Sequence, residues 1–214
     1  MTSPVRIGLV GMGTVGTGVV RVLQDSAEHI SRQAGRAVIV EHVVVQNPSK
    51  PRSIKLRSHQ ISNEFARVRD NPEISIVALL LGGLEPARTL AIELLKSGKD
   101  LVTANKALLA EHGPELFEVA HKAGRSIAFE AAVAGGIPIV AAISECLTGN
   151  QISSIRGILN GTSNFILTKM EQDGSDYHEV LELAQAEGYA EADPSMDVDG
   201  TDATQKLALL THLA

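Results

Sequence analysis

Two charged residues near the end of the chain, Asp202 and Lys206, have the types and the spacing for proton-transfer chemistry. The apolar residues of 201–213 recur at helical intervals, so the two side chains are predicted to share one helix face, one turn apart. A lysine held beside a carboxylate can carry a proton to or from a substrate oxygen. The other interpretation is a solvated ion pair on a surface helix, with no catalytic role. Further carboxylates precede this pair in the sequence: Glu191, Asp193, Asp197 and Asp199.

A glycine-rich turn near the start of the chain has the spacing of a dinucleotide-binding motif. The apolar run 5–10 predicts a strand, and 17–24 predicts a helix with a buried face formed by Val19, Val20, Val22 and Leu23. Gly11, Gly13 and Gly16 lie at the end of the predicted strand in the G-x-G-x-x-G pattern. The pattern predicts a nucleotide site, and the alternative is a purely structural turn.

Each glycine of this motif has a physical role at its position. Gly11 permits the tight turn, Gly13 lets the backbone approach a pyrophosphate, and Gly16 lets the helix pack closely against the strand. The start of the helix, at Thr14 and Val15, would then offer unpaired N–H groups and a partial positive charge to the phosphates.

Strands and helices alternate over 5–130, which predicts a doubly wound parallel sheet of the α/β class. The small, glycine-rich segment 131–136 is interpreted as a hinge. We therefore expect a Rossmann-type nucleotide-binding domain over 1–136, followed by the start of an α+β substrate and dimerisation domain over 137–214. Further strands are predicted at 37–45, 74–81, 101–103, 126–129 and 152–159. Further helices are predicted at 85–97, 111–122, 137–147, 165–172 and 177–187, with a polar turn at 160–164.

The composition excludes some classes of protein. The net charge of −6 argues against non-specific nucleic-acid binding, which needs a basic surface. No apolar run reaches transmembrane length, and the first residues lack a signal peptide's pattern. We therefore expect a cytoplasmic protein that binds neither membranes nor nucleic acid. The lone Cys146 lies in an apolar run, which favours an inert buried thiol over a nucleophile.

Charges after the second predicted strand bear on the choice between NAD and NADP. An acid there would favour NAD and an arginine would favour NADP, but Gln46 and Asn47 are neither. Positive charges follow within the loop and lean towards NADP, or they are simply solvated: Lys50, Arg52, Lys55 and Arg57.

The motifs taken together resemble those of the homoserine dehydrogenase family. The resemblance rests on residues 8–16, 82–87, 103–108, 130–138, 158–164 and 188–194, with Asp202 and Lys206. It implies NAD(P)-dependent interconversion of L-homoserine and L-aspartate 4-semialdehyde, a step of threonine and methionine biosynthesis. It also implies that members of the family continue beyond the position of Ala214, so the alternative is a catalytically incompetent NAD(P)-binding fragment. A third interpretation, acylating aldehyde chemistry, would need a cysteine nucleophile.

The resemblance also implies roles for individual residues. Lys206 matches the proton donor and acceptor, Asp202 the residue that orients the substrate, and Lys106 a lysine between nicotinamide and substrate. The implied substrate site comprises Glu191 at the ammonium group, Asp197, Asp202 and Thr162. The implied cofactor site adds Gly82, Thr103, Lys106 and Gly188 to Gly11, Gly13, Thr14, Val15 and Gly16. A sodium site is implied at Glu130, Val133, Gly135 and Ile137, and a homodimer is implied for the full-length protein.

Overall fold

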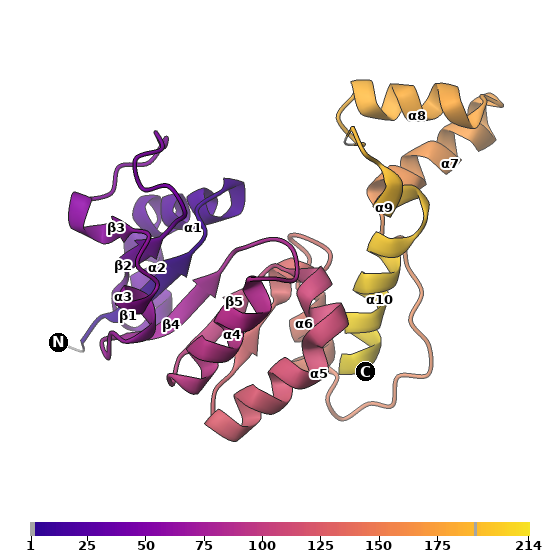
Figure 1. Ribbon diagram of the computed structural model, residues 1–214. Helices are drawn as coiled ribbons and strands as arrows, with labels where there is room; N and C mark the ends of the chain where they lie inside the picture. Colours follow the sequence, from indigo (N-terminus) through magenta and orange to yellow (C-terminus); the bar gives the residue numbers. More distant parts are fainter. Residues whose placement is uncertain (1–2, 191) are drawn as a thin grey trace. The chain divides into compact units, whose positions relative to one another are not determined.

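The computed structural model describes residues 3–190 and 192–214 (Figure 1). The chain folds into two compact units, one ending at Ala132 and the other beginning at Val133. The boundary expected from the sequence, between residues 136 and 137, lies four residues further along the chain. No helix among the described residues combines the length and the apolar character needed to cross a bilayer.

Unit 1 is built on a six-stranded sheet whose paired strands all run parallel, which confirms the predicted α/β fold (Figure 1). In spatial order the strands are β3 (Ile61–Ser62), β2 (Val38–Val44), β1 (Val5–Val10), β4 (Ile74–Leu79), β5 (Asp100–Thr103) and β6 (Ile127–Ala128). The chain order reverses between β1 and β4. Sheets of this kind bind ligands at the carboxyl ends of the strands beside such a switch point.

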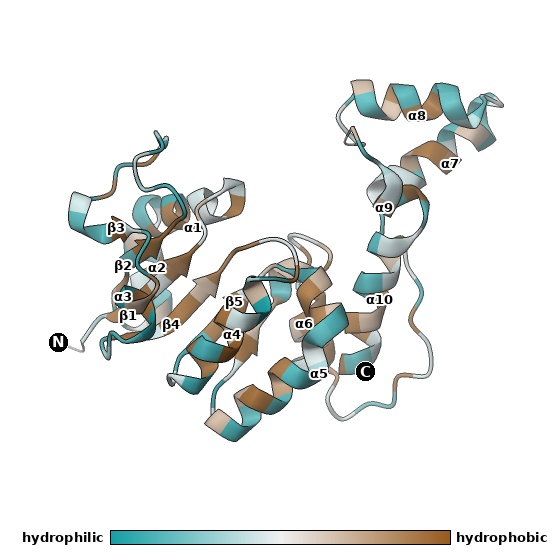
Figure 2. Ribbon diagram, in the orientation of Figure 1, coloured by the Kyte–Doolittle hydropathy of each residue, from teal (hydrophilic) through white to brown (hydrophobic). Residues whose placement is uncertain are grey.

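Helices cover the strands of unit 1 and bury their side chains. The helices are α1 (Thr14–Asp25), α2 (Ala27–Ala34), α3 (Ala66–Arg69), α4 (Ala87–Lys96) and α5 (Lys106–Ala123), with short 3-10 turns η1 (Ser58–Gln60) and η2 (Glu130–Ala132). The first three pack against β2, and α4 packs against β4, β5 and α5. Leu9, Val20 and Val43 are fully buried in this core. The strands are drawn mostly in brown in Figure 2, as expected for a parallel sheet covered by helices.

The expected buried face of α1 is correct at Val20 and wrong at Val22, whose exposed fraction is 56%. Val15, seven residues earlier on the same helix face, is exposed to a similar extent at 53%. Residues seven apart lie two turns apart on one side of a helix, so this side of α1 faces away from the sheet.

Among the described residues of unit 2, every element of regular structure is a helix or a helical turn. It contains α6 (Ile139–Ala141), a π-helical turn η3 (Ala142–Cys146), α7 (Gly161–Asp173), α8 (Tyr177–Ala186), α9 (Ser195–Val198) and α10 (Thr201–Leu213). Ile166, Val180 and Ala184 form a small apolar core between α7 and α8. Helix α10 has the bounds predicted from the sequence.

The strand predicted at 152–159 is wrong, because these residues form no regular structure. The isoleucines Ile152, Ile155 and Ile158 are spaced by three, which does not match the two-residue alternation of a strand. A strand also needs a partner, and no described residue of unit 2 belongs to one. Ile158 is accordingly 75% exposed.

Helices α5 and α7 begin earlier than predicted, and in both the asparagine before the first turn explains the difference. Helix α5 begins at Lys106 because Asn105 caps it, its side chain accepting a hydrogen bond from the Leu108 N–H. Helix α7 begins at Gly161 because Asn160 accepts from the Ser163 N–H in the same way. The predicted polar turn at 160–164 is therefore the first turn of a helix.

Candidate functional site

The glycine turn between β1 and α1 leaves no room for side chains at two of its positions. The φ angle of Gly11 is +96°, a conformation that favours glycine. A Cβ on Gly11 would lie 2.7 Å from the carbonyl oxygen of Leu80, and a Cβ on Gly16 would overlap the carbonyl oxygen of Gly11. These glycines therefore let β1, β4 and α1 approach one another.

Gly13 differs from these two, because nothing lies within 4 Å of the Cβ position that it leaves empty. It is the N-cap residue of α1 and carries no capping side chain, so the N–H groups of the first turn are not taken up by a side chain. Thr14 and Val15 are exposed in this turn. The arrangement forms an open cradle that a phosphate group would fit.

A pocket of about 780 Å³ adjoins this turn. It is lined by the ends of the strands on both sides of the switch point, namely Val10–Gly13 after β1 and Leu80–Gly82 after β4. The end of β2 contributes Val44–Asn47, and Lys50 and Arg52 complete one side. Of the residues predicted to bind the cofactor, Gly11, Gly13 and Gly82 therefore line one concave site within unit 1.

Asn105 fixes the loop that follows β4. Its amide nitrogen donates to the carbonyl oxygens of Leu81, at 3.0 Å, and of Gly83, at 2.6 Å. The neighbouring Thr103 is buried, and its hydroxyl accepts a hydrogen bond from the Asn105 N–H at 3.2 Å. Lys106 follows at the first position of α5 and is half-buried. The loop after β4 is thus fixed to the start of α5.

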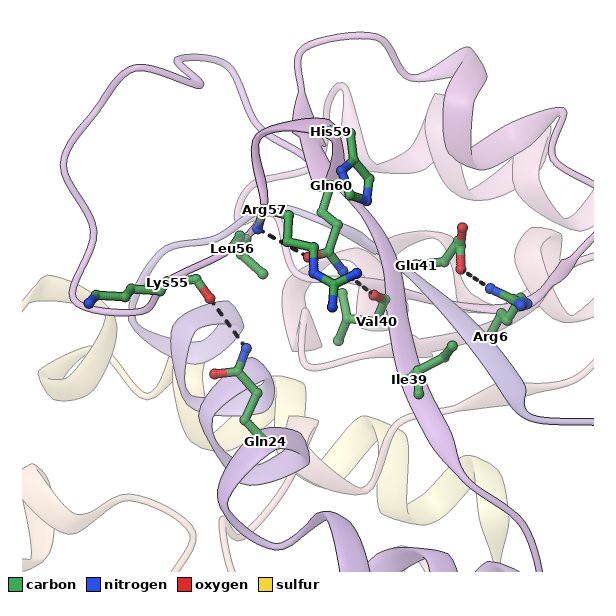
Figure 3. Close-up of a pocket in the computed structure, with 10 residues that line it drawn as sticks. All are labelled: Arg6, Gln24, Ile39, Val40, Glu41, Lys55, Leu56, Arg57, His59 and Gln60. Atoms are coloured by element: carbon green, nitrogen blue, oxygen red, sulfur yellow. Dashed lines mark hydrogen bonds and ion pairs between the residues drawn. The ribbon is translucent and has the colours of Figure 1, made fainter.

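The loop after β2 divides its four cations between two pockets. The Arg52 guanidinium donates to the carbonyl oxygens of Asn47, Pro48 and Lys50, so it closes its own loop. Lys50 lines the pocket beside the glycine turn, whereas Lys55 and Arg57 line a second pocket of about 630 Å³ (Figure 3).

The second pocket lies over the first half of β2, and several of the residues that line it bond to one another. Arg6 and Glu41 form a close ion pair, and the Gln60 amide donates to the Val40 carbonyl oxygen at 2.9 Å (Figure 3). Ile39 and Leu56 supply its apolar lining. Apart from Lys55 and Arg57, no described residue of the predicted sites lines this pocket.

In unit 2, Lys206 and Asp202 form the pair predicted from their spacing. The Lys206 ammonium donates to Asp202 Oδ2 at 2.6 Å and to the carbonyl oxygen of Leu159 at 2.7 Å. The side chains of Lys206 and Asp202 are only 21% and 10% exposed. The pair is therefore not a solvated one on a surface helix, which was the alternative interpretation.

Two further side chains join this pair. The Asn160 amide nitrogen donates to Asp202 Oδ2 at 2.9 Å and to Asp197 Oδ1 at 2.7 Å. The starts of α7, α9 and α10 therefore meet at a cluster of two carboxylates, one amide and one ammonium group. The sequence pattern did not identify Asn160 as part of the site. The signal that could have identified it is its position just before the first turn of α7.

Thr162 and Ser163 fix the loops around this cluster. The Thr162 hydroxyl donates to the carbonyl oxygen of Tyr189 at 2.6 Å, and the Tyr189 ring stacks on Phe165 with centroids 4.5 Å apart. The Ser163 hydroxyl donates to the Asp197 carbonyl oxygen at 2.6 Å. Thr162 is thus placed to hold the segment that leads to Glu191, which itself lies outside the described residues.

For the remaining predicted residues, the description is limited to the backbone. Gly188 has a φ of +79° after the end of α8. In the proposed sodium segment, Glu130 lies in the turn η2, and Gly135 follows Ala134 with φ angles of +54° and +58°. Among the described residues, no group of three or more His, Cys, Asp or Glu side chains could hold a metal. A site made of carbonyl oxygens stays a prediction.

Cys146 is exposed, so the expectation of a buried thiol is wrong. It ends the π-helical turn η3, where the ladder of backbone hydrogen bonds is wider than in the α-helix that was predicted. Residues 144–150 are all exposed, so the apolar run around Cys146 is not covered by other parts of the described chain.

Comparison with known families decides the identity of the chain. The family model for the NAD-binding domain of homoserine dehydrogenase matches residues 11–130, and the homoserine dehydrogenase model matches residues 138–214. The chain belongs to the homoserine dehydrogenase family. The two matches cover the glycine turn and the Asp202–Lys206 pair respectively.

Individual relatives agree with this assignment. The chain is 47% identical to the homoserine dehydrogenase of Synechocystis over 98% of its length and 44% identical to that of Bacillus subtilis, again over 98%. A solved homoserine dehydrogenase from Thiobacillus denitrificans matches with a TM-score of 0.88 and 46% identity over 98% of the chain and 48% of that structure. A hyperthermophilic archaeal homoserine dehydrogenase, solved in complex with NADPH, matches with a TM-score of 0.83 and 25% identity over 99% of the chain and 70% of that structure. The chain spans about half the length of the curated relatives that it matches, 48% for these two.

Proposed function

We propose that this protein interconverts L-homoserine and L-aspartate 4-semialdehyde with NAD(P) as the hydride carrier, and so serves threonine and methionine biosynthesis. The observation that carries the proposal is the hydrogen bond of 2.6 Å between Lys206 and Asp202 in a mostly buried cluster. It rests also on membership of the family.

In this proposal Lys206 moves the proton. In the oxidation, the neutral Lys206 amine accepts the proton of the substrate's hydroxyl group. The hydride leaves the carbon that bears this hydroxyl group, which gives an aldehyde. In the reverse direction the ammonium form returns that proton to the carbonyl oxygen. NAD(P), when bound, takes up or supplies the hydride. Typical gains from such proton transfer are about 10²–10⁴-fold in rate.

The other residues bind and orient the substrate. Asp202, bound to Lys206 and Asn160, is the proposed orienting carboxylate, and Asp197 and Thr162 are proposed to line the substrate site. Glu191 is proposed to receive the ammonium group of the substrate, and Lys106 to lie between nicotinamide and substrate. An amino acid carries both charges, so a site with carboxylates and lysines is complementary to it.

The cofactor site is proposed to be the pocket beside the glycine turn. The open Cβ position of Gly13 and the uncapped start of α1 support a bound pyrophosphate. The proposed cofactor is NADP or NAD. Lys50 supports NADP because it lines this pocket, whereas Arg52 is engaged with its own loop. A sodium ion at 130–137 and a homodimer of the full-length protein are further proposals drawn from the resemblance.

A second candidate is that this chain binds NAD(P) without oxidising homoserine, since it spans about half of its relatives' length. Homoserine-dependent reduction of NAD⁺ and of NADP⁺ separates the two candidates and ranks the cofactors. The exposed Cys146 makes the thiol-dependent alternative testable in the same assay. We expect Cys146→Ala to keep its activity, whereas loss of activity would support acylating aldehyde chemistry.

A further inference from the structure

One amide side chain, that of Asn160, joins the two carboxylates of the cluster in unit 2. Its nitrogen lies 2.7 Å from Asp197 Oδ1 and 2.9 Å from Asp202 Oδ2. Asn160 is 8% exposed and Asp202 is 7% exposed, so water has little access to this junction. Each of the two amide hydrogens can therefore serve one carboxylate.

The orientation of this amide is determined by its third hydrogen bond. Asn160 Oδ1 accepts from the Ser163 N–H at 2.7 Å, and a backbone N–H can only donate. Rotating the amide by half a turn would place its NH₂ group against that N–H and its oxygen against two carboxylates. The hydrogen-bond network thus excludes the flipped orientation.

The charges of the cluster indicate a second structural role for this amide, besides capping α7. Asp197 and Asp202 repel each other when both are ionised, and the Lys206 ammonium group contacts Asp202. Asp202 Oδ2 accepts from both Lys206 and Asn160, so the amide keeps this oxygen turned towards the lysine. The start of α10, where Asp202 is the second residue, adds a favourable partial positive charge.

We propose that Asn160 is a positioning residue, which holds the Asp197 and Asp202 carboxylates apart and keeps Asp202 aligned with Lys206 for proton transfer. Its effect on turnover rests on the proposed function of Lys206, whereas the hydrogen bonds themselves can be tested without turnover. The residue acts through Asp202 and Lys206.

The first test separates capping from positioning. Asn160→Asp keeps an N-cap acceptor but replaces the amide donor by a third carboxylate. We expect normal folding, unchanged affinity for NADPH, and a kcat for homoserine oxidation reduced at least tenfold. Asn164→Asp makes the same chemical change at an exposed position four residues along α7 and should leave all three quantities unchanged. Wild-type kcat in Asn160→Asp would show that Asn160 only caps the helix, which would overturn the proposal.

Asn160→Ser provides a second variant without added charge. Serine caps helices as well as asparagine does, but its shorter side chain cannot donate to both carboxylates. We expect a kcat between those of the wild-type protein and Asn160→Asp, with unchanged NADPH affinity. A wild-type kcat in Asn160→Ser would also overturn the proposal, even if Asn160→Asp does not fold.

The second test uses NMR of the uniformly ¹⁵N-labelled chain and needs no catalysis. The side-chain NH₂ of Asn160, assigned by its absence in Asn160→Ser, should give two distinct proton resonances protected from solvent exchange. Asp202→Asn should shift one of them and Asp197→Asn the other. Rapid solvent exchange, or resonances that neither substitution moves, would overturn the inference. If the wild-type chain lacks turnover, the proposed function fails for this chain while the NMR result still decides the role of Asn160.

Discussion

The side-chain amide of Asn105 donates a hydrogen bond of 2.6 Å to the carbonyl oxygen of Gly83, which lies 22 residues earlier in the chain. The same nitrogen reaches the Leu81 carbonyl oxygen, while Asn105 Oδ1 caps α5. The loop after β4, which lines the proposed cofactor pocket, is therefore held by one side chain from the next strand–helix connection.

We predict that Asn105→Ser weakens NADPH binding and lowers the free energy of unfolding by about 1 kcal/mol, because two carbonyl oxygens lose their donor. Serine retains the helix cap, so Asn105→Ala should lose about 1 kcal/mol more. Urea denaturation and NADPH titration measure the two effects. Wild-type NADPH affinity in Asn105→Ser would mean that the loop holds its position without this amide.

Gly13→Ala should fold normally and bind NADPH about tenfold more weakly, equivalent to ~1.4 kcal/mol. The new methyl group meets no atom of the protein, and the φ of −80° at Gly13 suits alanine. It would occupy space that the pyrophosphate needs. Gly18→Ala is the matched control, since Gly18 also has open space around it but does not line the pocket. Equal NADPH affinity of the two variants would refute a phosphate position beside Gly13.

His42 gives the stability of the protein a component that depends on pH. Burial lowers the pKa of His42, and the nearby positive charge of Arg67 lowers this pKa further. The folded state therefore favours the neutral ring, whereas the unfolded chain takes up a proton below its ordinary pKa of about 6.5. This contribution is fully present above pH ~6.5 and is lost as the pH falls towards the lowered pKa, at no more than about 1.4 kcal/mol per pH unit.

We therefore expect the Tm of the wild-type chain to fall between pH 7.5 and pH 5.5, and to fall less in His42→Gln. His29→Gln, which changes an exposed histidine of α2, should keep the wild-type slope. Calorimetric scans at both pH values make the comparison. Identical slopes in the wild-type chain and His42→Gln would show that another group is responsible.

Local patterns predicted those parts of the fold that depend on local physics. The G-x-G-x-x-G turn follows directly from the spacing of Gly11, Gly13 and Gly16, and the apolar period of 201–213 gave α10 with its Asp202–Lys206 pair. The failures lie where the determining contact is distant. Asn160 bonds to side chains 37 and 42 residues further along, which no local pattern encodes. Cys146 was expected to be buried because apolar residues surround it in the sequence, but residues 144–150 are all exposed, and whether such a run is covered depends on distant parts of the chain.

The central claim, that Lys206 moves the proton, is tested most directly by homoserine-dependent reduction of NADP⁺ in the wild-type chain, Lys206→Ala and Lys169→Ala. Lys169 is a matched control because it also pairs with an aspartate four residues along its helix, Asp173, but on the exposed surface. We predict that Lys206→Ala loses about 10²–10⁴-fold in turnover while keeping its NADPH affinity, and that Lys169→Ala is unaffected. Turnover in Lys206→Ala within a few-fold of the wild-type chain would contradict the account.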